Sequence, residues 1–371
     1  MENFFTAVTL LLLGVLFSSL AFSGAESVGV CYGRIGNDLP TEEDVVDFYI
    51  TSGIKKMRLY DPNQATLMAA YAKFSNLELI LGVANQDIQA LASDFSAAAN
   101  WVQQNVLPYT PGVYFRYIAV GNEIKPTDPI APFVLPAMQN IYNALESIAP
   151  SQALQINVST AIDSSLLGSS FPPSAGAFSD IANSYIVPIV KFLAEKRAPL
   201  LANIYPYFAY IGDPMSIDIN YALFTSPGVV VQDGPFGYQN MFDAMLDAYY
   251  SALEKVGAFD VEVVVSETGW PSDGGIAASV EYASAYYQNL ISHVETSGTG
   301  SPRRAGWPIQ AYLFAMFDEN LKGPAETERH FGLFSPDKQP KDTVDSATIQ
   351  RTTIQVPQLS DNFTELRFFI F

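Results

Sequence analysis

Cysteine and histidine are almost absent from this 371-residue sequence. Cys31 is the single cysteine, so no disulfide can form within the chain, and His293 and His330 are the only histidines. A catalytic thiol needs a histidine partner, and zinc or copper sites are usually built from several Cys and His ligands. We therefore predict a chain with no cofactor and no metal, in which Cys31 is a buried and inert thiol.

Basic residues are also scarce. The chain has 19 Lys and Arg against 38 Asp and Glu, which gives a formal net charge of −19. A field of this sign repels nucleic-acid phosphates and anionic lipid head groups, so we expect neither nucleic acid nor a membrane surface as a partner. A neutral polymer is indifferent to the charge, and such a partner remains open.

Long apolar runs are confined to the first residues of the chain. The run centred on Leu10–Phe17 is short for a membrane span, and the small residues Ser23–Ala25 follow it. We predict a signal peptide over residues 1–25, although its first three residues carry no Lys or Arg, and no membrane span after its removal. The protein is then expected to be secreted, to the extracellular space or cell wall, with the vacuole as the alternative.

The rest of the chain divides into one large domain and a tail. We expect a single folded domain over residues 26–341 and a C-terminal extension of uncertain structure over residues 342–371. Two sequons, at Asn157 and Asn362, permit N-glycosylation on a secretory route, and chance occurrence is the alternative.

Short apolar runs alternate with segments of helical character along that domain. Hydrophobic residues make up 49% of the chain and charged residues 15%, which is enough for a large core. The predicted strands are 28–33, 54–60, 77–84, 115–123, 154–161, 200–207, 261–269 and 309–319. The first predicted helix begins at Thr41. Further helices are predicted over 87–104, 133–148, 238–256 and 276–293. This alternation predicts an α/β fold, a single-domain (β/α)₈ TIM barrel. An open doubly wound sheet is the alternative, but no Gly-x-Gly-x-x-Gly turn follows the first strand.

Two glutamates directly follow apolar runs at predicted strand ends. Glu123 ends the fourth run and Glu267 lies near the end of the seventh. Because active sites of such barrels lie at the carboxyl ends of the strands, both should face one cleft. A carboxylate there is costly to bury unless it is partnered or used, and an ion pair with Arg58 or Lys322 is the structural alternative. Two carboxylates of different protonation state are what glycosidic bond cleavage requires.

The segment around Glu267 resembles a known signature. Residues 263–274, Val-Val-Val-Ser-Glu-Thr-Gly-Trp-Pro-Ser-Asp-Gly, are similar to the signature of glycoside hydrolase family 17, the plant endo-β-1,3-glucanases. Further similar stretches, in the family's order, are 28–33, 58–62, 120–124, 203–208 and 317–322. The resemblance covers about residues 27 to 341.

The resemblance implies a function and a role for each matching residue. Glu267 matches the nucleophile and Glu123 the general acid/base of a retaining enzyme, whose carboxyl groups lie about 5–5.5 Å apart. The residues implied in substrate binding are Tyr60, Asn122, Tyr205, Phe208, Trp270, Glu319, Lys322 and Glu328. For Trp270, packing beneath the rim loop is the alternative. The implied partner is β-1,3-glucan, from callose or fungal walls, bound by a monomer.

Two other functions remain open. A mixed-linkage 1,3-1,4-β-glucanase would use the same catalytic pair and differ only in the shape of its subsites. A glucan-binding wall protein without catalytic activity would be expected to lack one of the two carboxylates, and this chain has both.

Overall fold

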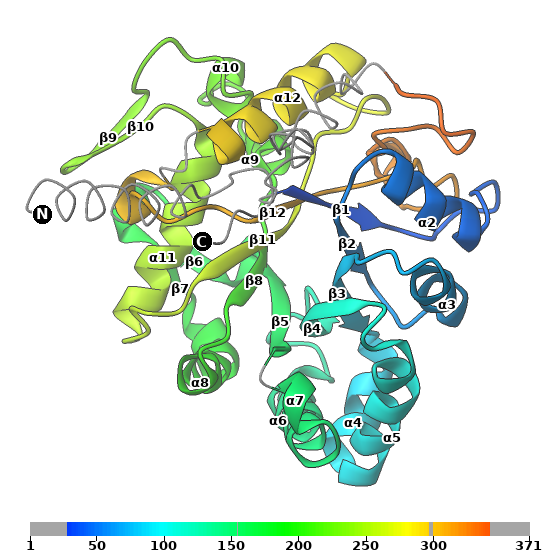
Figure 1. Cartoon of the computed structure of the whole chain (residues 1–371). Coiled ribbons are helices and arrows are strands. Elements are labelled where there is room, and N and C mark those ends of the chain that lie inside the picture. The colour runs from blue at the N-terminus through cyan, green and yellow to red at the C-terminus, as the bar shows by residue number, and fades with distance from the viewer. Residues whose placement is uncertain (1–27, 154, 297–299, 342–371) are drawn as a thin grey trace, which may run out of the picture.

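The computed structural model describes residues 28–153, 155–296 and 300–341, and its centre is a closed barrel. Eight parallel strands close in the order β1-β12-β11-β8-β5-β4-β3-β2 (Figure 1). They are β1 Val28–Tyr32, β2 Lys56–Leu59, β3 Glu78–Val83, β4 Tyr114–Asn122, β5 Asn157–Asp163, β8 Leu200–Asn203, β11 Val263–Thr268 and β12 Ala311–Leu313. The predicted TIM barrel is confirmed. The predicted signal peptide, the C-terminal extension and the Asn362 sequon lie outside the described residues.

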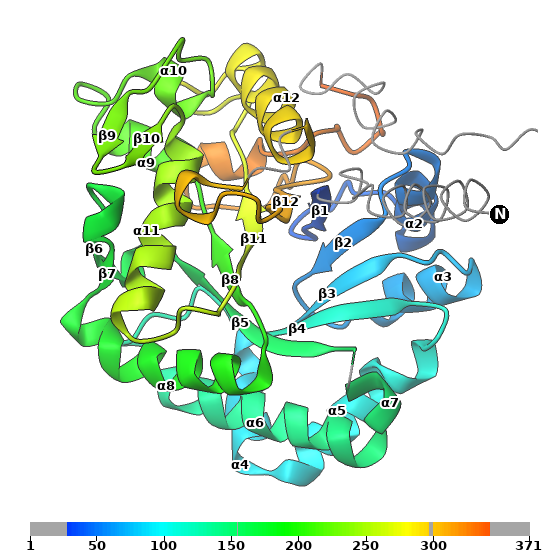
Figure 2. The same ribbon diagram turned by 60° about the vertical axis from the view of Figure 1, so that its left-hand side comes forward.

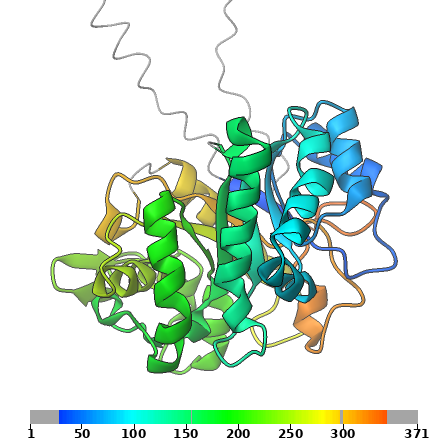
Figure 3. The same cartoon turned by 90° about the horizontal axis from the view of Figure 1, so that it is seen from below.

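Helices surround the barrel (Figures 1 and 2). They are α2 Glu42–Thr51, α3 Gln64–Ala72, α4 Ile88–Ser93, α5 Phe95–Asn105, α6 Ala131–Ile148, α7 Pro150–Ala153, α8 Asp180–Lys196, α9 Pro206–Gly212, α10 Ile219–Ala222, α11 Met241–Lys255 and α12 Val280–Thr296. The view from below shows α6 and α8 side by side on the outside of the barrel (Figure 3). The core consists of the barrel interior and the layer between strands and helices. Within the described ranges, no helix has the length and apolar character needed to cross a membrane.

Side-chain caps explain where several helices begin. Thr41 has extended backbone and its side chain accepts a hydrogen bond from the Asp44 amide, as the sequence pattern predicts. The helix predicted over 87–104 is wrong in one respect, because it breaks into α4 and α5 at Asp94. The backbone of Asp94 is extended, and its carboxylate accepts a hydrogen bond from the Ser96 amide at 2.8 Å to cap the second helix.

Two predicted strands end several residues earlier in the structure than predicted. The run over 200–207 ends as a strand at Asn203, because Pro206 cannot donate to the sheet and instead opens α9. The run over 309–319 forms a strand only as far as Leu313. Phe314 and Met316 nevertheless still donate backbone hydrogen bonds to the neighbouring Thr268 and Cys31 carbonyls, both at 2.8 Å. The polar residues that follow each strand therefore stay near the barrel mouth.

Small hairpins extend the loops between barrel strands. The pairs are β6 Leu167–Ser169 with β7 Ala177–Phe178, and β9 Val231–Asp233 with β10 Phe236–Tyr238. The first lies against α11 and the second near α10, as the two labelled views agree (Figures 1 and 2). Neither was expected from the sequence, since such short strands leave no apolar run.

Candidate active site

A cleft of about 630 Å³ lies at the carboxyl ends of the barrel strands. With one exception, it brings together all of the site residues that the sequence predicts. The residues that line it are Tyr60, Asn122, Glu123, Tyr205, Phe208, Glu267, Glu319, Lys322 and Glu328. The exception is Trp270.

Glu123 is placed by an unusual turn at the end of β4. Its φ is +53° and that of Gly121 is +79°, while the Glu123 amide donates to the Ala161 carbonyl of β5 at 2.9 Å. A positive φ is uncommon for a residue other than glycine and is often found at functional sites. Burial raises the pKa of Glu123, and the negative charge of Glu267 raises it further. The arrangement favours the protonated form of Glu123.

Glu267 is held by donors on both carboxylate oxygens. The Tyr60 hydroxyl donates to Oε1 at 2.9 Å and the Tyr205 hydroxyl donates to Oε2 at 2.8 Å. Burial raises the pKa of both tyrosines well above the ordinary value, so these hydroxyls stay protonated and donate. Arg58 Nη1 lies 2.8 Å from Oε1. These contacts solvate a negative charge on Glu267, which is only 6% exposed, and fix its orientation.

Arg58 forms the floor of the cleft. This guanidinium is only 1% exposed, and beyond Glu267 its Nη1 donates to the Asn203 Oδ1 at 3.0 Å and the Ser266 carbonyl at 2.9 Å. Its Nη2 donates to the Asn122 Oδ1 at 2.7 Å. A buried guanidinium has to be satisfied by several acceptors, and these residues supply them to Nη1 and Nη2, although Nε has no partner among the described residues.

Asn203, at the end of β8, links the two glutamates: it bonds Glu123 directly and reaches Glu267 through Arg58. Arg58 and the Ser266 hydroxyl both donate to its Oδ1, at 3.0 and 2.8 Å. Because Arg58 can only donate, the amide is oriented with its nitrogen toward Glu123. Nδ2 donates to Glu123 Oε1 at 2.8 Å and to Asn122 Oδ1 at 3.1 Å. The bond from Nδ2 to Glu123 lowers the pKa of Glu123 and so partly offsets the increase caused by burial and by the charge of Glu267.

Glu319 and Lys322 line another part of the cleft. Lys322 Nζ lies 3.8 Å from Glu319 Oε2 and 3.4 Å from Glu328 Oε2. Burial raises the pKa of Glu319, and the Lys322 charge opposes this effect. The Ile35 amide donates to Glu319 Oε1 at 2.8 Å. A Cβ on Gly33 would lie 2.3 Å from the Glu319 carboxylate, so only glycine fits beside it.

Trp270 does not reach the cleft, and its prediction as a sugar-binding residue is corrected. Its side chain is fully buried, and its ring lies 5.1 Å from that of Tyr207 and 5.6 Å from that of Tyr286. Its Nε1 donates to the Ala277 carbonyl at 2.8 Å. The indole therefore packs beneath the loop after β11. Because it is fully buried, neither face of its ring is accessible to a sugar.

Several residues of the cleft were missed by sequence reasoning. Arg58 was considered as an ion-pair partner and as part of a similar stretch, and Asn203 only as part of a similar stretch. Arg34 Nη2 donates to both Asp61 carboxylate oxygens, at 2.6 and 2.8 Å, within the cleft. Phe314 lies under the Lys322 ammonium, which is 3.8 Å from its ring centroid. The one available signal was position, since each of these residues lies in or just after a strand.

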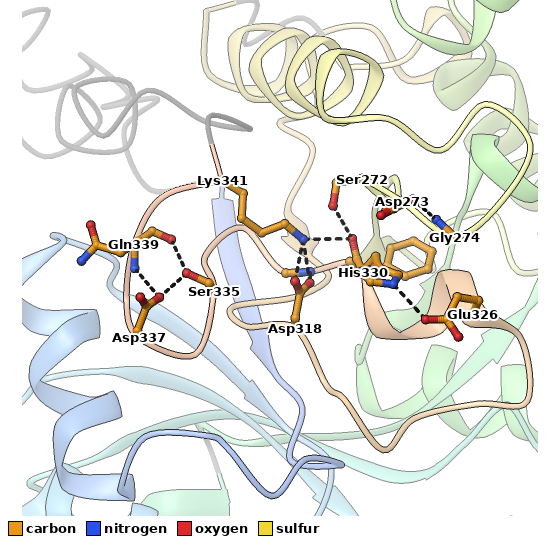
Figure 4. A network of polar contacts seen from close by, with 12 residues as sticks. Ser272, Asp273, Gly274, Asp318, Glu326, His330, Ser335, Asp337, Gln339 and Lys341 are labelled. Atoms are coloured by element: carbon orange, nitrogen blue, oxygen red, sulfur yellow. Dashed lines mark hydrogen bonds and ion pairs between the residues drawn. The ribbon is translucent and has the colours of Figure 1, made fainter.

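The loops after β11 and β12 are joined by polar contacts outside the cleft (Figure 4). The Ser272 amide and hydroxyl donate to the His330 carbonyl at 2.9 and 3.1 Å. Lys341 Nζ donates to both oxygens of Asp318 at 2.7 Å, and Asp318 also accepts from the Gly332 amide at 2.9 Å. These contacts fix the backbone that carries Glu267 on one side and Glu319 on the other.

Comparison with known proteins relates the whole barrel to one family. The sequence matches the glycosyl hydrolases family 17 over residues 28–346. A Vitis vinifera protein named glucan endo-1,3-beta-glucosidase is 56% identical over 337 residues, 90% of this chain and 96% of that one. A Nicotiana plumbaginifolia protein, named the basic vacuolar isoform, is 51% identical over 90% of each chain. A solved structure, from work on two plant beta-glucan endohydrolases with distinct substrate specificities, aligns with TM-score 0.80 and 44% identity. The alignment covers 85% of this chain and 99% of that one.

Proposed function

This chain belongs to glycosyl hydrolase family 17, and we propose that it is a retaining endo-β-1,3-glucanase with Glu123 as acid/base and Glu267 as nucleophile. The endo-1,3-β-glucanase activity follows from the relatives, and the assignment of residues and stereochemistry is our proposal. The observation that carries it is electrostatic. Two carboxylates line one cleft, and the charge of one raises the pKa of the other.

The proposed reaction proceeds in two steps. Glu123 donates its proton to the departing glycosidic oxygen while the Glu267 carboxylate attacks the anomeric carbon and forms a covalent glucosyl-enzyme. The ionised Glu123 then takes a proton from water, which attacks the same carbon and releases the sugar with net retention. The raised pKa of Glu123 supports the first step, and the Asn203 donor supports the ionised form needed in the second.

The remaining cleft residues are proposed to bind the glucan. The Phe208 ring is 42% exposed and can stack on the apolar face of a pyranose. Asn122 lies between Arg58 and Asn203, next to Glu123, where it can meet a hydroxyl beside the reacting carbon. Glu319, Lys322 and Glu328 would bind hydroxyl groups further along the cleft.

Product analysis on laminarin tests the proposal. Short β-1,3-oligosaccharides should appear from the start, and NMR in the first minutes should show the β-anomer at the new reducing ends. An initial α-anomer would overturn the retaining assignment. A higher kcat/KM on mixed-linkage 1,3-1,4-β-glucan than on laminarin would favour the mixed-linkage alternative. Tight glucan binding without any product would favour the non-catalytic one.

The site of action is a further part of the proposal. This chain is acidic, with a net charge of −19, and in this it differs from the relative whose name is the basic vacuolar isoform. We propose that residues 1–25 are removed, that the catalytic domain spans residues 26–341, and that the monomeric enzyme acts outside the cell on callose or fungal wall glucan. N-terminal sequencing of the extracellular protein tests the processing step, and a mature chain that begins at Met1 would refute it.

A further inference from the structure

A second hollow lies at the opposite end of the barrel from the cleft. It has a volume of about 390 Å³, and we call it the basal hollow. Lys56 opens β2, Val263 opens β11 and Gln310 directly precedes β12, and all of them line it. Because the barrel strands are parallel, residues at their starts lie together at the end that carries no catalytic residues.

A tryptophan on the wall of the basal hollow is fixed in place. Trp307 is 41% exposed, whereas Trp101 and Trp270 are buried, and it contacts Arg304. The Arg304 guanidinium carbon lies 5.4 Å from the Trp307 ring centroid and 4.8 Å from that of Tyr250. Glu254 Oε1 holds the guanidinium at 3.0 Å. A ring fixed in this way loses little conformational entropy when a ligand stacks on it.

The surroundings of Trp307 are aromatic and of mixed charge. Phe259 is 59% exposed, and its carbonyl accepts a hydrogen bond from Arg304 at 3.1 Å. Arg116 and the exposed Glu262 line the hollow, and Lys56 there is paired with Glu78 at 3.0 Å. The hollow thus combines an apolar ring face with positively charged hydrogen-bond donors and a negatively charged acceptor.

This chemistry fits a neutral sugar. A pyranose has an apolar face that stacks on an aromatic ring and equatorial hydroxyls that both donate and accept hydrogen bonds. An anionic ligand would meet Glu262 and the acidic field of the whole chain. We propose that the basal hollow binds a β-1,3-glucan chain on Trp307 and so holds the enzyme on polymeric substrate; the identity of the sugar rests on the proposed function.

The consequence differs between polymeric and short substrates. A second contact with the same polymer raises the effective concentration of glucan at the cleft when the polymer chain is long enough to pass from one end of the barrel to the other. A short oligosaccharide that occupies the cleft gains nothing from it. The basal hollow therefore acts on insoluble glucan and leaves the chemistry at Glu123 and Glu267 unchanged.

The Trp307→Ala variant of the full chain tests the proposal, with Trp307→Phe retaining a ring. Phe171→Ala is the matched control, because Phe171 is 73% exposed and lines neither the cleft nor the basal hollow. Two measurements are made on each variant: hydrolysis of soluble laminarihexaose and of insoluble curdlan, and retention on curdlan in a brief incubation in the cold.

For Trp307→Ala we expect retention on curdlan to be roughly five- to tenfold weaker than for the parent, which corresponds to the loss of one stacking contact. The rate of curdlan hydrolysis at a low concentration of curdlan should fall by a similar factor. Its kcat/KM on laminarihexaose should match the parent. Trp307→Phe should be intermediate, and Phe171→Ala should match the parent on both substrates.

Two outcomes separate this inference from the proposed function. If Trp307→Ala equals the parent on curdlan while both cut laminarihexaose, the basal site is refuted and the enzyme assignment is unaffected. If the parent cuts neither substrate, the proposed function fails, and retention on curdlan still decides the basal site. Retention that is independent of Trp307 refutes it, and retention lost in Trp307→Ala supports it.

Discussion

Removal of the Asn203 amide tests the electrostatic balance at Glu123. In Asn203→Ala, the donor 2.8 Å from Glu123 Oε1 is lost, and with it a bond that stabilises the ionised carboxylate. A hydrogen bond to a charged group contributes about 1.5–3 kcal/mol, and 1.36 kcal/mol is a tenfold change in a protonation equilibrium. The pKa of Glu123 should therefore rise. Since the first step needs protonated Glu123, the alkaline limb of activity should move to higher pH by about one pH unit.

The assay is the pH profile of kcat/KM on laminarihexaose, which reports groups of the free enzyme. Ser266→Ala is the matched control, because the Ser266 hydroxyl contacts the other end of the same amide at 2.8 Å. Ser266→Ala should leave the alkaline limb of kcat/KM at the parental pH, since Arg58 still orients Asn203. A limb that stays fixed or moves to lower pH in Asn203→Ala would refute the reasoning. An equal loss of kcat/KM at every pH would mean that Asn203 has only a structural role.

Three further variants test other parts of the site and the fold. Glu267→Ala should lose turnover of laminarin by several orders of magnitude while affinity electrophoresis still shows binding, and near-parental turnover would place the nucleophile elsewhere. Tyr205→Phe keeps the ring but loses the bond to Glu267, so kcat/KM should fall roughly 10- to 100-fold; an unchanged value would mean that this bond is dispensable. Burial raises the pKa of Asp247 from 3.8 to about 6, so the folded state binds this proton more tightly than the unfolded chain does. The unfolding free energy should fall by about 2 kcal/mol as pH rises from 4 to 6, and Asp247→Asn should lack this fall in thermal unfolding.

The barrel was predictable because its determinants are local. Each strand buried on both faces leaves a nearly continuous apolar run, of which Val263–Val265 is an example, and several helices begin at a side-chain cap that the sequence carries. The positions of Glu123 and Glu267 follow from the same pattern, because the fold class determines which end of every strand carries the site. The limits of strands and helices were predicted less accurately. Pro206 opens a helix soon after β8, and Asp94 separates two helices, both through backbone geometry that an apolar pattern does not register.

Trp270 shows where position along the chain is insufficient. It lies three residues after Glu267, on the rim, where a sugar-binding aromatic is expected. The side to which a rim residue points depends on the path of the loop, and here the loop directs the indole onto Tyr207 and Tyr286 beneath it. Phe208, which the structure leaves 42% exposed in the cleft, lies in α9 after β8. Residue type and position predicted sugar binding for both, and only the fold separates them: Trp270 packs in the core, while Phe208 lines the cleft.

Arg58 was the hardest residue to interpret from the sequence, because an ion pair and a catalytic role for Glu267 were taken as alternatives. The structure shows the ion pair, and it is compatible with the proposed catalytic role. A buried Glu267 needs a cation, yet the guanidinium has more donors than one carboxylate can satisfy, so it also bonds Asn122 and Asn203. Those bonds orient the Asn203 nitrogen toward Glu123. Neutralising the charge of Glu267, the proposed nucleophile, thereby also positions the donor for Glu123, the proposed acid/base, and these residues become neighbours only when the barrel closes.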